Sequence, residues 1–240
     1  MKPMTLYFAK STMRTAVSIS AAFLSLATLA SAQTILVDFS ENSGVASPNW
    51  NLSNTASFNI TDMVDSNGNA TGIDLVFTAP GTPSESGLWG VTGAPSPFDT
   101  SAAYNDGLFG GSGVITTFEL RNLSPTDTYT LTLFASRDTT TNRTTNYTVT
   151  GSGTGSTLSL QTSGANVGGA GINHNISNVA VFSDISANGS NVITVSFTNP
   201  SDFSYLNAME IHVIPEPASF AMILGGIGLM LIFVRRKMRR

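Results

Sequence analysis

The chain has 240 residues, enough for one or two domains, and eight of its 11 Lys and Arg lie near its two ends. Residues 33–214 carry three arginines against 14 Asp and Glu, a net charge of −11 that argues against nucleic acid as a partner. The chain has no cysteine, which excludes disulfides, thiol catalysis and thiolate metal sites.

Residues 1–32 have the pattern of a secretory signal peptide. Three basic residues open it: Lys2, Lys10 and Arg14. An uncharged apolar run over 16–29 follows, and Ala30 and Ala32 place small residues at the cleavage positions, so we expect cleavage before Gln33. The implied partners are the secretion machinery and a signal peptidase. An uncleaved signal anchor is the alternative.

Residues 33–214 are expected to form one extracellular β-domain, because Thr, Ser, Asn and Gly favour strands and turns over helices. Alternation of apolar and polar residues predicts strands over 35–39, 56–60, 73–78, 114–120, 129–133, 147–149, 157–160, 179–182, 193–197 and 209–213. About ten short strands predict an all-β fold, an antiparallel β-sandwich of the jelly-roll type. The Gly- and Pro-rich stretch 79–113 is expected to drape over one end or face of it.

Oxygen-bearing side chains cluster at Asp62, Asp65, Asn67 and Asn69, a spacing that can wrap a hard cation such as calcium. No acidic residue stands at the closing position of a twelve-residue calcium loop, however. The alternative, a polar hairpin turn built on Asn67 and Gly68, is favoured. No other cofactor is expected, since two histidines about forty residues apart and no thiols make a poor zinc site.

Sugar binding needs an aromatic platform and planar polar groups, and four residues are candidates for it: Trp50, Trp89, Arg137 and Arg143. Arg137 lies just past the end of one predicted strand and Arg143 just before the start of the next, so both could sit on one rim and bind hydroxyls or carboxylates. The alternatives are that the tryptophans belong to the core and that Arg137 pairs with Asp138.

We expect no catalytic residue and no enzymatic activity. The segment 110–114 fails the Gly-x-Ser-x-Gly pattern at its last position. His174 lies in a Gly-rich loop and His212 at an outward position of the last predicted strand, so neither is a strong candidate for a Ser-His-Asp triad. Glycosidase chemistry needs two carboxylates across a cleft, which a sequence cannot pair.

The C-terminal segment 215–240 has three parts. Pro215, Glu216 and Pro217 end the last strand, because prolines two apart continue neither a strand nor a helix. An uncharged run over 218–234 is long enough for a transmembrane helix of about 25 Å. A basic cluster closes the chain, and the positive-inside rule places it in the cytoplasm: Arg235, Arg236, Lys237, Arg239 and Arg240.

The segment 213–219 (VIPEPAS), the apolar run and the basic end together resemble the sorting signal of PEP-CTERM proteins. The resemblance implies a Gram-negative bacterium and recognition by an exosortase, which cuts near Pro-Glu-Pro. The precursor would be anchored in the inner membrane by its C-terminal helix and then reach the cell surface or the extracellular matrix. A single-span tail anchor without processing is the alternative.

The segments 128–150 and 205–211 resemble galactose-binding-like or malectin-like β-sandwiches, many of which bind sugars. The leading hypothesis is a non-enzymatic structural or adhesive protein of the cell envelope, associated with exopolysaccharide. The alternative is a carbohydrate-binding module, and a hydrolase of matrix glycans comes third.

Overall fold

The computed structural model describes residues 32–40, 48–54, 57–79, 82–83 and 89–216. The expected cleavage residue Ala30, the apolar run 218–234, Pro217 and the basic cluster lie outside these residues. Within the described part, no helix is long and apolar enough to cross a membrane. The described residues form one compact unit, Ala32–Pro215.

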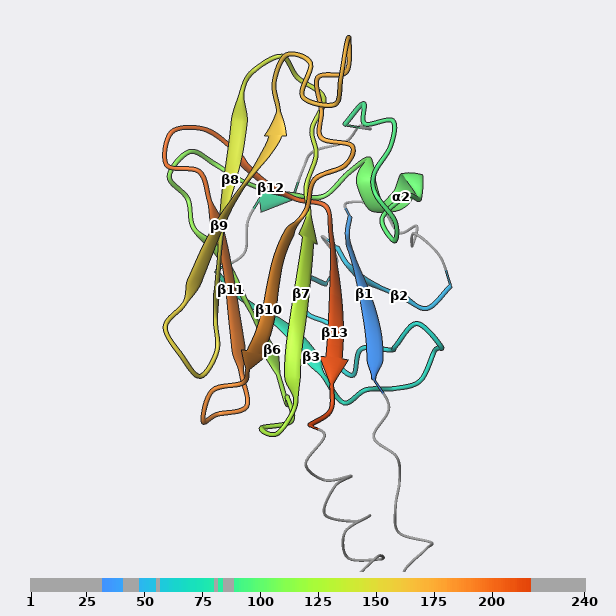
Figure 1. The fold of residues 1–240 in the computed structure, drawn as a ribbon, viewed down its shortest axis with the longest axis vertical. Helices are drawn as coiled ribbons and strands as arrows, with labels where there is room; N and C mark the ends of the chain where they lie inside the picture. Colours follow the sequence, from blue (N-terminus) through green and yellow to red (C-terminus); the bar gives the residue numbers. More distant parts are fainter. Residues whose placement is uncertain (1–31, 41–47, 55–56, 80–81, 84–88, 217–240) are drawn as a thin grey trace, which may run out of the picture. The chain divides into compact units, whose positions relative to one another are not determined.

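Two five-stranded sheets make up most of this unit (Figure 1). The first has the order β10 (Ala180–Ser186), β7 (Thr128–Phe134), β13 (Ala208–Ile214), β1 (Gln33–Phe39) and β2 (Trp50–Ser53). The second has the order β3 (Asp74–Ala79), β6 (Thr116–Arg121), β11 (Ile193–Thr198), β8 (Arg143–Thr150) and β9 (Ser156–Ser163). A small sheet contains β12 (Ser204–Leu206), β5 (Leu108–Gly110) and β4 (Thr82–Pro83), and the described helix is α2 (Ser101–Tyr104).

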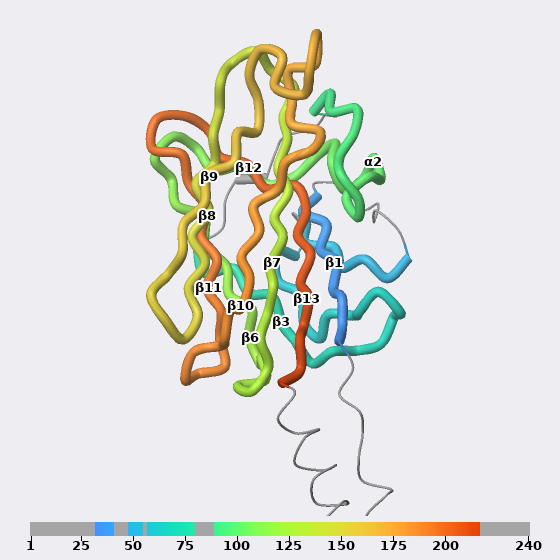
Figure 2. Tube along the Cα trace, viewed as in Figure 1, coloured from blue at the N-terminus to red at the C-terminus, as the bar shows by residue number. Residues whose placement is uncertain are grey.

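The connections are those of a jelly-roll-like sandwich. Consecutive strands lie in opposite sheets at the β6–β7, β7–β8, β9–β10 and β10–β11 connections. Strand β1 pairs antiparallel with β13, joining Gln33 to Val213, and the two run side by side as the blue and red segments of Figure 2. The pair β1–β2 is parallel, which departs from the purely antiparallel sandwich that we predicted.

The core forms between the inward faces of the two sheets, as the alternating pattern requires. Strands β6 and β11 both alternate strictly between buried and half-buried residues. Phe118 of β6 is fully buried and lies 5.7 Å from the ring of Phe39 in the opposite sheet and 5.3 Å from that of Phe77. Such contacts between sheets bury the apolar half of each strand.

The two ends of the sandwich differ. Strand β13 begins opposite Phe134, where β7 ends, and finishes opposite Thr128, where β7 begins. We call the end with Phe134 the loop end. It carries α2 and β12 (Figure 1), and β5 pairs with β12 there. Ile214 lies at the opposite end, about 20 Å away along a seven-residue strand.

Candidate ligand-binding site

Arg137 and Arg143 line one cavity at the loop end, with a volume of about 250 Å³. Arg137 follows β7, and Arg143 is the first residue of β8. Three aromatic residues complete the lining: Phe109 of β5, Tyr205 of β12, and Phe203 just before β12. We call this cavity the arginine pocket. From the sequence we expected that the two arginines could share one rim, and in the structure both line this cavity.

Arg143 is held by several contacts. Its Nε donates to a carboxylate oxygen of Asp202 at 3.2 Å, and its Nη1 donates to the hydroxyl of Tyr205. Its guanidinium carbon lies 5.0 Å from the ring centroid of Phe203. The side chain keeps only 18% of its surface exposed. The charge of Arg143 is therefore partly compensated by Asp202.

Arg137 lies over an aromatic ring. Its guanidinium carbon is 5.2 Å from the ring centroid of Trp89. Trp89 is 2% exposed and also packs edge to face on Tyr205, with 5.2 Å between ring centroids. Trp89 therefore forms a wall behind Arg137 and is not an open platform. The Asp138 carboxylate, which we considered as a partner of Arg137, approaches His174 Nδ1 at 3.6 Å.

Tyr205 is fixed through its backbone by the neighbouring strand β8. Its N–H donates to Thr145 Oγ1 at 2.8 Å, and its carbonyl accepts from the hydroxyl of Tyr147. Burial raises the pKa of the Tyr205 hydroxyl, while the nearby charges of Arg143 and Arg137 oppose that shift. The hydroxyl therefore stays protonated at neutral pH and accepts a hydrogen bond from Arg143.

Asn207 ties together the segments that surround the pocket. Its Oδ1 accepts from the N–H of Ser136 at 2.8 Å, one residue before Arg137. Its Nδ2 donates to the carbonyls of Tyr104 at 2.9 Å and Asp106 at 2.8 Å. Gly107 follows Asp106 in the chain. A Cβ atom on residue 107 would lie 2.6 Å from the carbonyl oxygen of Leu206. This close approach of two backbones needs glycine.

Trp50, our fourth sugar-binding candidate, lies outside the arginine pocket. It is 8% exposed and packs edge to face on Phe98 at 6.5 Å. Both belong to a second apolar cluster with Phe134 and Ala208. The structure therefore brings Trp89, Arg137 and Arg143 together and separates Trp50 from them.

The cluster proposed for calcium forms a polar turn. Asp65 Oδ1 accepts from the backbone N–H groups of Asn67 and Asn69, both at 2.9 Å. Hydrogen bonds from Asn69 are the main reason that the pKa of Asp65 is lowered. Asp62 Oδ1 accepts from the N–H of Gly72 at 2.7 Å. Among the described residues, no group of three or more His, Asp or Glu is placed to hold a metal ion.

His174 has the outline of a hydrolase triad but not its chemistry. Its Nε2 lies 3.2 Å from Thr92 Oγ1, and its Nδ1 lies 3.6 Å from the Asp138 carboxylate. The backbone N–H of Thr92 also donates to Nε2, at 3.1 Å. Neutral imidazole has one acceptor nitrogen with a single lone pair, so this Nε2 cannot also take a hydroxyl proton. His174 thus acts as a clamp between the loops that carry Thr92 and Asp138.

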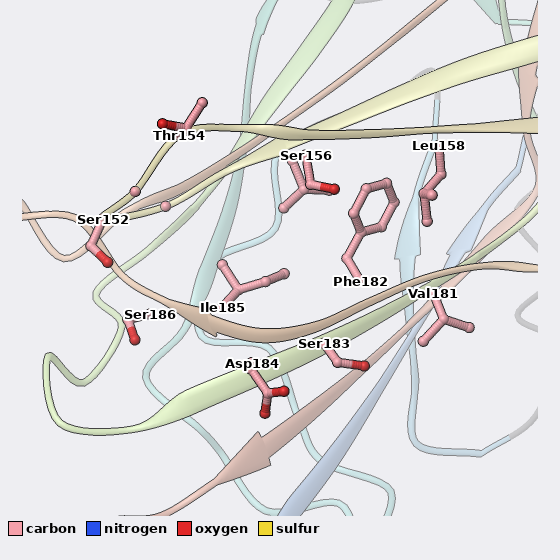
Figure 3. A pocket seen from close by; sticks show the side chains of 13 residues that line it. Ser152, Thr154, Ser156, Leu158, Val181, Phe182, Ser183, Asp184, Ile185 and Ser186 are labelled. Atoms are coloured by element: carbon pink, nitrogen blue, oxygen red, sulfur yellow. The ribbon is translucent and has the colours of Figure 1, made fainter.

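A second cavity, of about 370 Å³, lies between the edge strands β9 and β10 (Figure 3). Phe182 and Ile185 project into it towards the strand that carries Ser156 and Leu158. Its polar lining consists mainly of hydroxyls, and Asp184 is the one charged residue that lines it. It lacks the convergent charged and aromatic groups of the arginine pocket, which is therefore the stronger candidate site.

Phe109, Phe203 and Tyr205 were missed as site residues by sequence reasoning. Two of them sit in the segment 202–205 (DFSY), where two aromatic residues lie six and four residues before the start of the last predicted strand at 209. The sequence signal for these two residues was a pair of aromatic side chains close to an acidic residue, Asp202, shortly before a predicted strand. Phe109 carries no comparable signal.

Comparison with known proteins identifies the C-terminal segment most clearly. Residues 213–240 match the PEP-CTERM protein-sorting motif. The motif implies an exported, membrane-anchored precursor that is recognised by an exosortase, which is a membrane protease. No curated protein matches the chain significantly.

Solved structures give distant likenesses. The ANX1 ectodomain from Arabidopsis thaliana is 14% identical with a TM-score of 0.46, and the match covers 77% of this chain and 49% of that one. The ANX2 ectodomain from the same plant is 15% identical with a TM-score of 0.45, covering 77% and 50%. The chain thus spans about half the length of these ectodomains. At this level of similarity, nothing about function follows.

Proposed function

We propose that the chain is a non-enzymatic adhesive protein of the cell surface or extracellular matrix, and that its β-sandwich binds exopolysaccharide at the loop end. The arginine pocket carries this proposal. It combines two guanidinium groups, which donate planar pairs of hydrogen bonds, with aromatic rings that can pack on the apolar face of a sugar. Phe203 is 38% exposed and so keeps ring surface for such a contact.

The sorting motif supports the location in this proposal. A signal peptide over 1–32 would direct export, and the sandwich over 33–214 would be the exported domain. The segment 215–240 would hold the precursor in the inner membrane of a Gram-negative bacterium through a helix over 218–234. The basic cluster would stay in the cytoplasm. Processing by the exosortase would then release or re-anchor the sandwich.

The groups near the pocket favour binding over catalysis. A glycosidase needs two carboxylates that flank the scissile bond. Asp202 lies beside the pocket, where its carboxylate is engaged by Arg143 at 3.2 Å. His174, a second titratable group at this end, is committed to Thr92 through Nε2. Neither group is free to act as an acid, a base or a nucleophile.

The test is retention of the full chain on the native exopolysaccharide of the host. We expect saturable binding by the wild type that weakens by about tenfold or more in Phe203→Ala and in Arg143→Gln. Arg121→Gln is the matched control, because Arg121 of β6 pairs with Glu119 at 2.7 Å and does not line the pocket. Absence of binding by the wild type, or equal binding by all four proteins, would overturn the proposal. Unfolding temperatures establish that each variant is folded.

A further inference from the structure

The described residues carry few cationic side chains, and only some of these are paired with a carboxylate. The described residues include three arginines and no lysine. Arg121 is paired with Glu119 at 2.7 Å, and Arg143 with Asp202 at 3.2 Å. For the Arg137 guanidinium, the described residues supply no hydrogen bond and no carboxylate partner. The arginine pocket therefore holds a surplus positive charge within a segment, 33–214, whose net charge is −11.

The surplus charge is held in a fixed place. The guanidinium carbon of Arg137 lies over the Trp89 ring at 5.2 Å from its centroid, and the backbone N–H of Arg137 donates to the carbonyl of Thr162 at 3.2 Å. The preceding residue, Ser136, is also fixed. Its N–H donates to Asn207 Oδ1, and its Oγ donates to the carbonyl of Asn175 at 2.7 Å. A guanidinium in cation–π contact with a ring spends no N–H donor on that contact, so its donors remain available for a ligand. Binding would then cost little side-chain entropy.

The two guanidiniums line the same cavity, together with Tyr205. Arg143 donates to the Tyr205 hydroxyl, and the charges of both Arg143 and Arg137 act on the pKa of that hydroxyl. Arg143 shares its charge with Asp202, so Arg137 is the group left to meet an anion. Its planar fork matches the two oxygens of a carboxylate, which form parallel hydrogen bonds with it.

The size of the cavity limits the ligand. Its volume of about 250 Å³ is below the range of roughly 300–1,000 Å³ that is typical of pockets for drug-sized molecules. That space suits a single sugar ring. Phe203 and Phe109, packed edge to face at 5.6 Å, give the ring an apolar wall, and the guanidinium of Arg143 lies against the ring of Phe203.

We propose that the arginine pocket binds one carboxylated sugar residue of an acidic polysaccharide, with its carboxylate on Arg137 and its ring against Phe203. This inference rests on the proposed glycan-binding function and names the class of sugar. It also accounts for an arginine that has no carboxylate partner among the described residues, at the end remote from Ile214.

The experiment compares charged and neutral forms of one ligand. The full-length chain, produced in a host without an exosortase and purified in detergent, is titrated calorimetrically with trimers of galacturonic and mannuronic acid and with their methyl esters. We expect at least one acid to bind about tenfold or more tightly than its ester, and this preference to weaken as salt is raised. Arg137→Gln should abolish the preference and Arg137→Lys should keep part of it. Arg121→Gln should leave it unchanged.

Each other outcome counts against a defined part of the argument. Equal binding of acid and ester that is lost in Phe203→Ala overturns the acidic-sugar inference but leaves the glycan-binding function standing. No binding of any trimer, together with no retention on native exopolysaccharide, overturns both. An acid preference that survives Arg137→Gln overturns the assignment to Arg137. Equally tight binding of a glutamate tripeptide overturns the commitment to a sugar.

Discussion

At the scale of single residues, Tyr129 shows how a buried hydroxyl closes a turn. The ring is 1% exposed, and its hydroxyl accepts from the N–H of Ser124 at 2.8 Å and donates to the carbonyl of the same residue at 3.3 Å. Burial raises the pKa of Tyr129 to about 12. The backbone of the turn before β7 is thereby paired without help from water.

Tyr129→Phe should lower the free energy of unfolding by about 1 kcal/mol at neutral pH, because Ser124 loses its partner. The pKa is higher in the folded than in the unfolded chain, where it is near 10.0, so the contribution of the tyrosine is complete below about pH 10 and declines as the pH rises towards 12. Urea unfolding of both proteins between pH 7 and 11.5 measures this. A stability difference that stays constant over that range contradicts it.

The residues that line the arginine pocket were only partly predictable. Because Arg137 follows one predicted strand and Arg143 precedes the next, we predicted that both could sit on one rim, and both line the arginine pocket. Phe109 and Tyr205 reach the same cavity through the pairing of β5 with β12, two strands of three residues each, and no local pattern reports such a pairing. The two tryptophans differ only in tertiary packing: Trp89 lies under Arg137, while Trp50 packs on Phe98.

At the scale of elements, alternation predicted the strands that have one buried face. Strands β6, β7, β8, β11 and β13 all follow it closely. Strands β2, β4, β5 and β12 were missed because two to four residues are too few to show a period. The predicted strand over 56–60 is wrong for its described residues 57–60, which form only isolated bridges such as Ile60–Leu75.

Strand β10 offers a direct test of that alternation at a sheet edge. Phe182 is 4% exposed and fills the space between β9 and β10, while its neighbour Val181 is 44% exposed (Figure 3). We expect Phe182→Ala to lower the free energy of unfolding by about 3–5 kcal/mol, and Val181→Ala by less than about 1 kcal/mol. Chemical denaturation of the two variants checks this. Similar costs for both would show that β10 does not hold the register described here.

At the scale of the whole molecule, the arginine pocket lies at the loop end of the sandwich, and the sorting motif begins at residue 213, near the other end of β13. Strand β13 connects them, since it begins at Ala208 beside the segments that form the arginine pocket and ends at Ile214, where the sorting motif follows. A change in the sorting motif should therefore alter processing and leave ligand binding intact. This independence gives a test of the sorting role that does not depend on the identity of the glycan.

The intact mass of the chain from exosortase-containing cells should correspond to a product that starts near Gln33 and ends near Pro215–Pro217. Glu216→Ala should give a longer product that retains Arg240, because the exosortase would no longer recognise its site. The wild type in an exosortase-deficient strain should give the same longer product, because the enzyme is absent. Glu210→Gln on β13 is the matched control, a carboxylate change six residues earlier that should leave processing normal. Retention of Arg240 in every strain and variant would make the chain a tail-anchored surface protein, and the sandwich would then act at the membrane and not in the matrix.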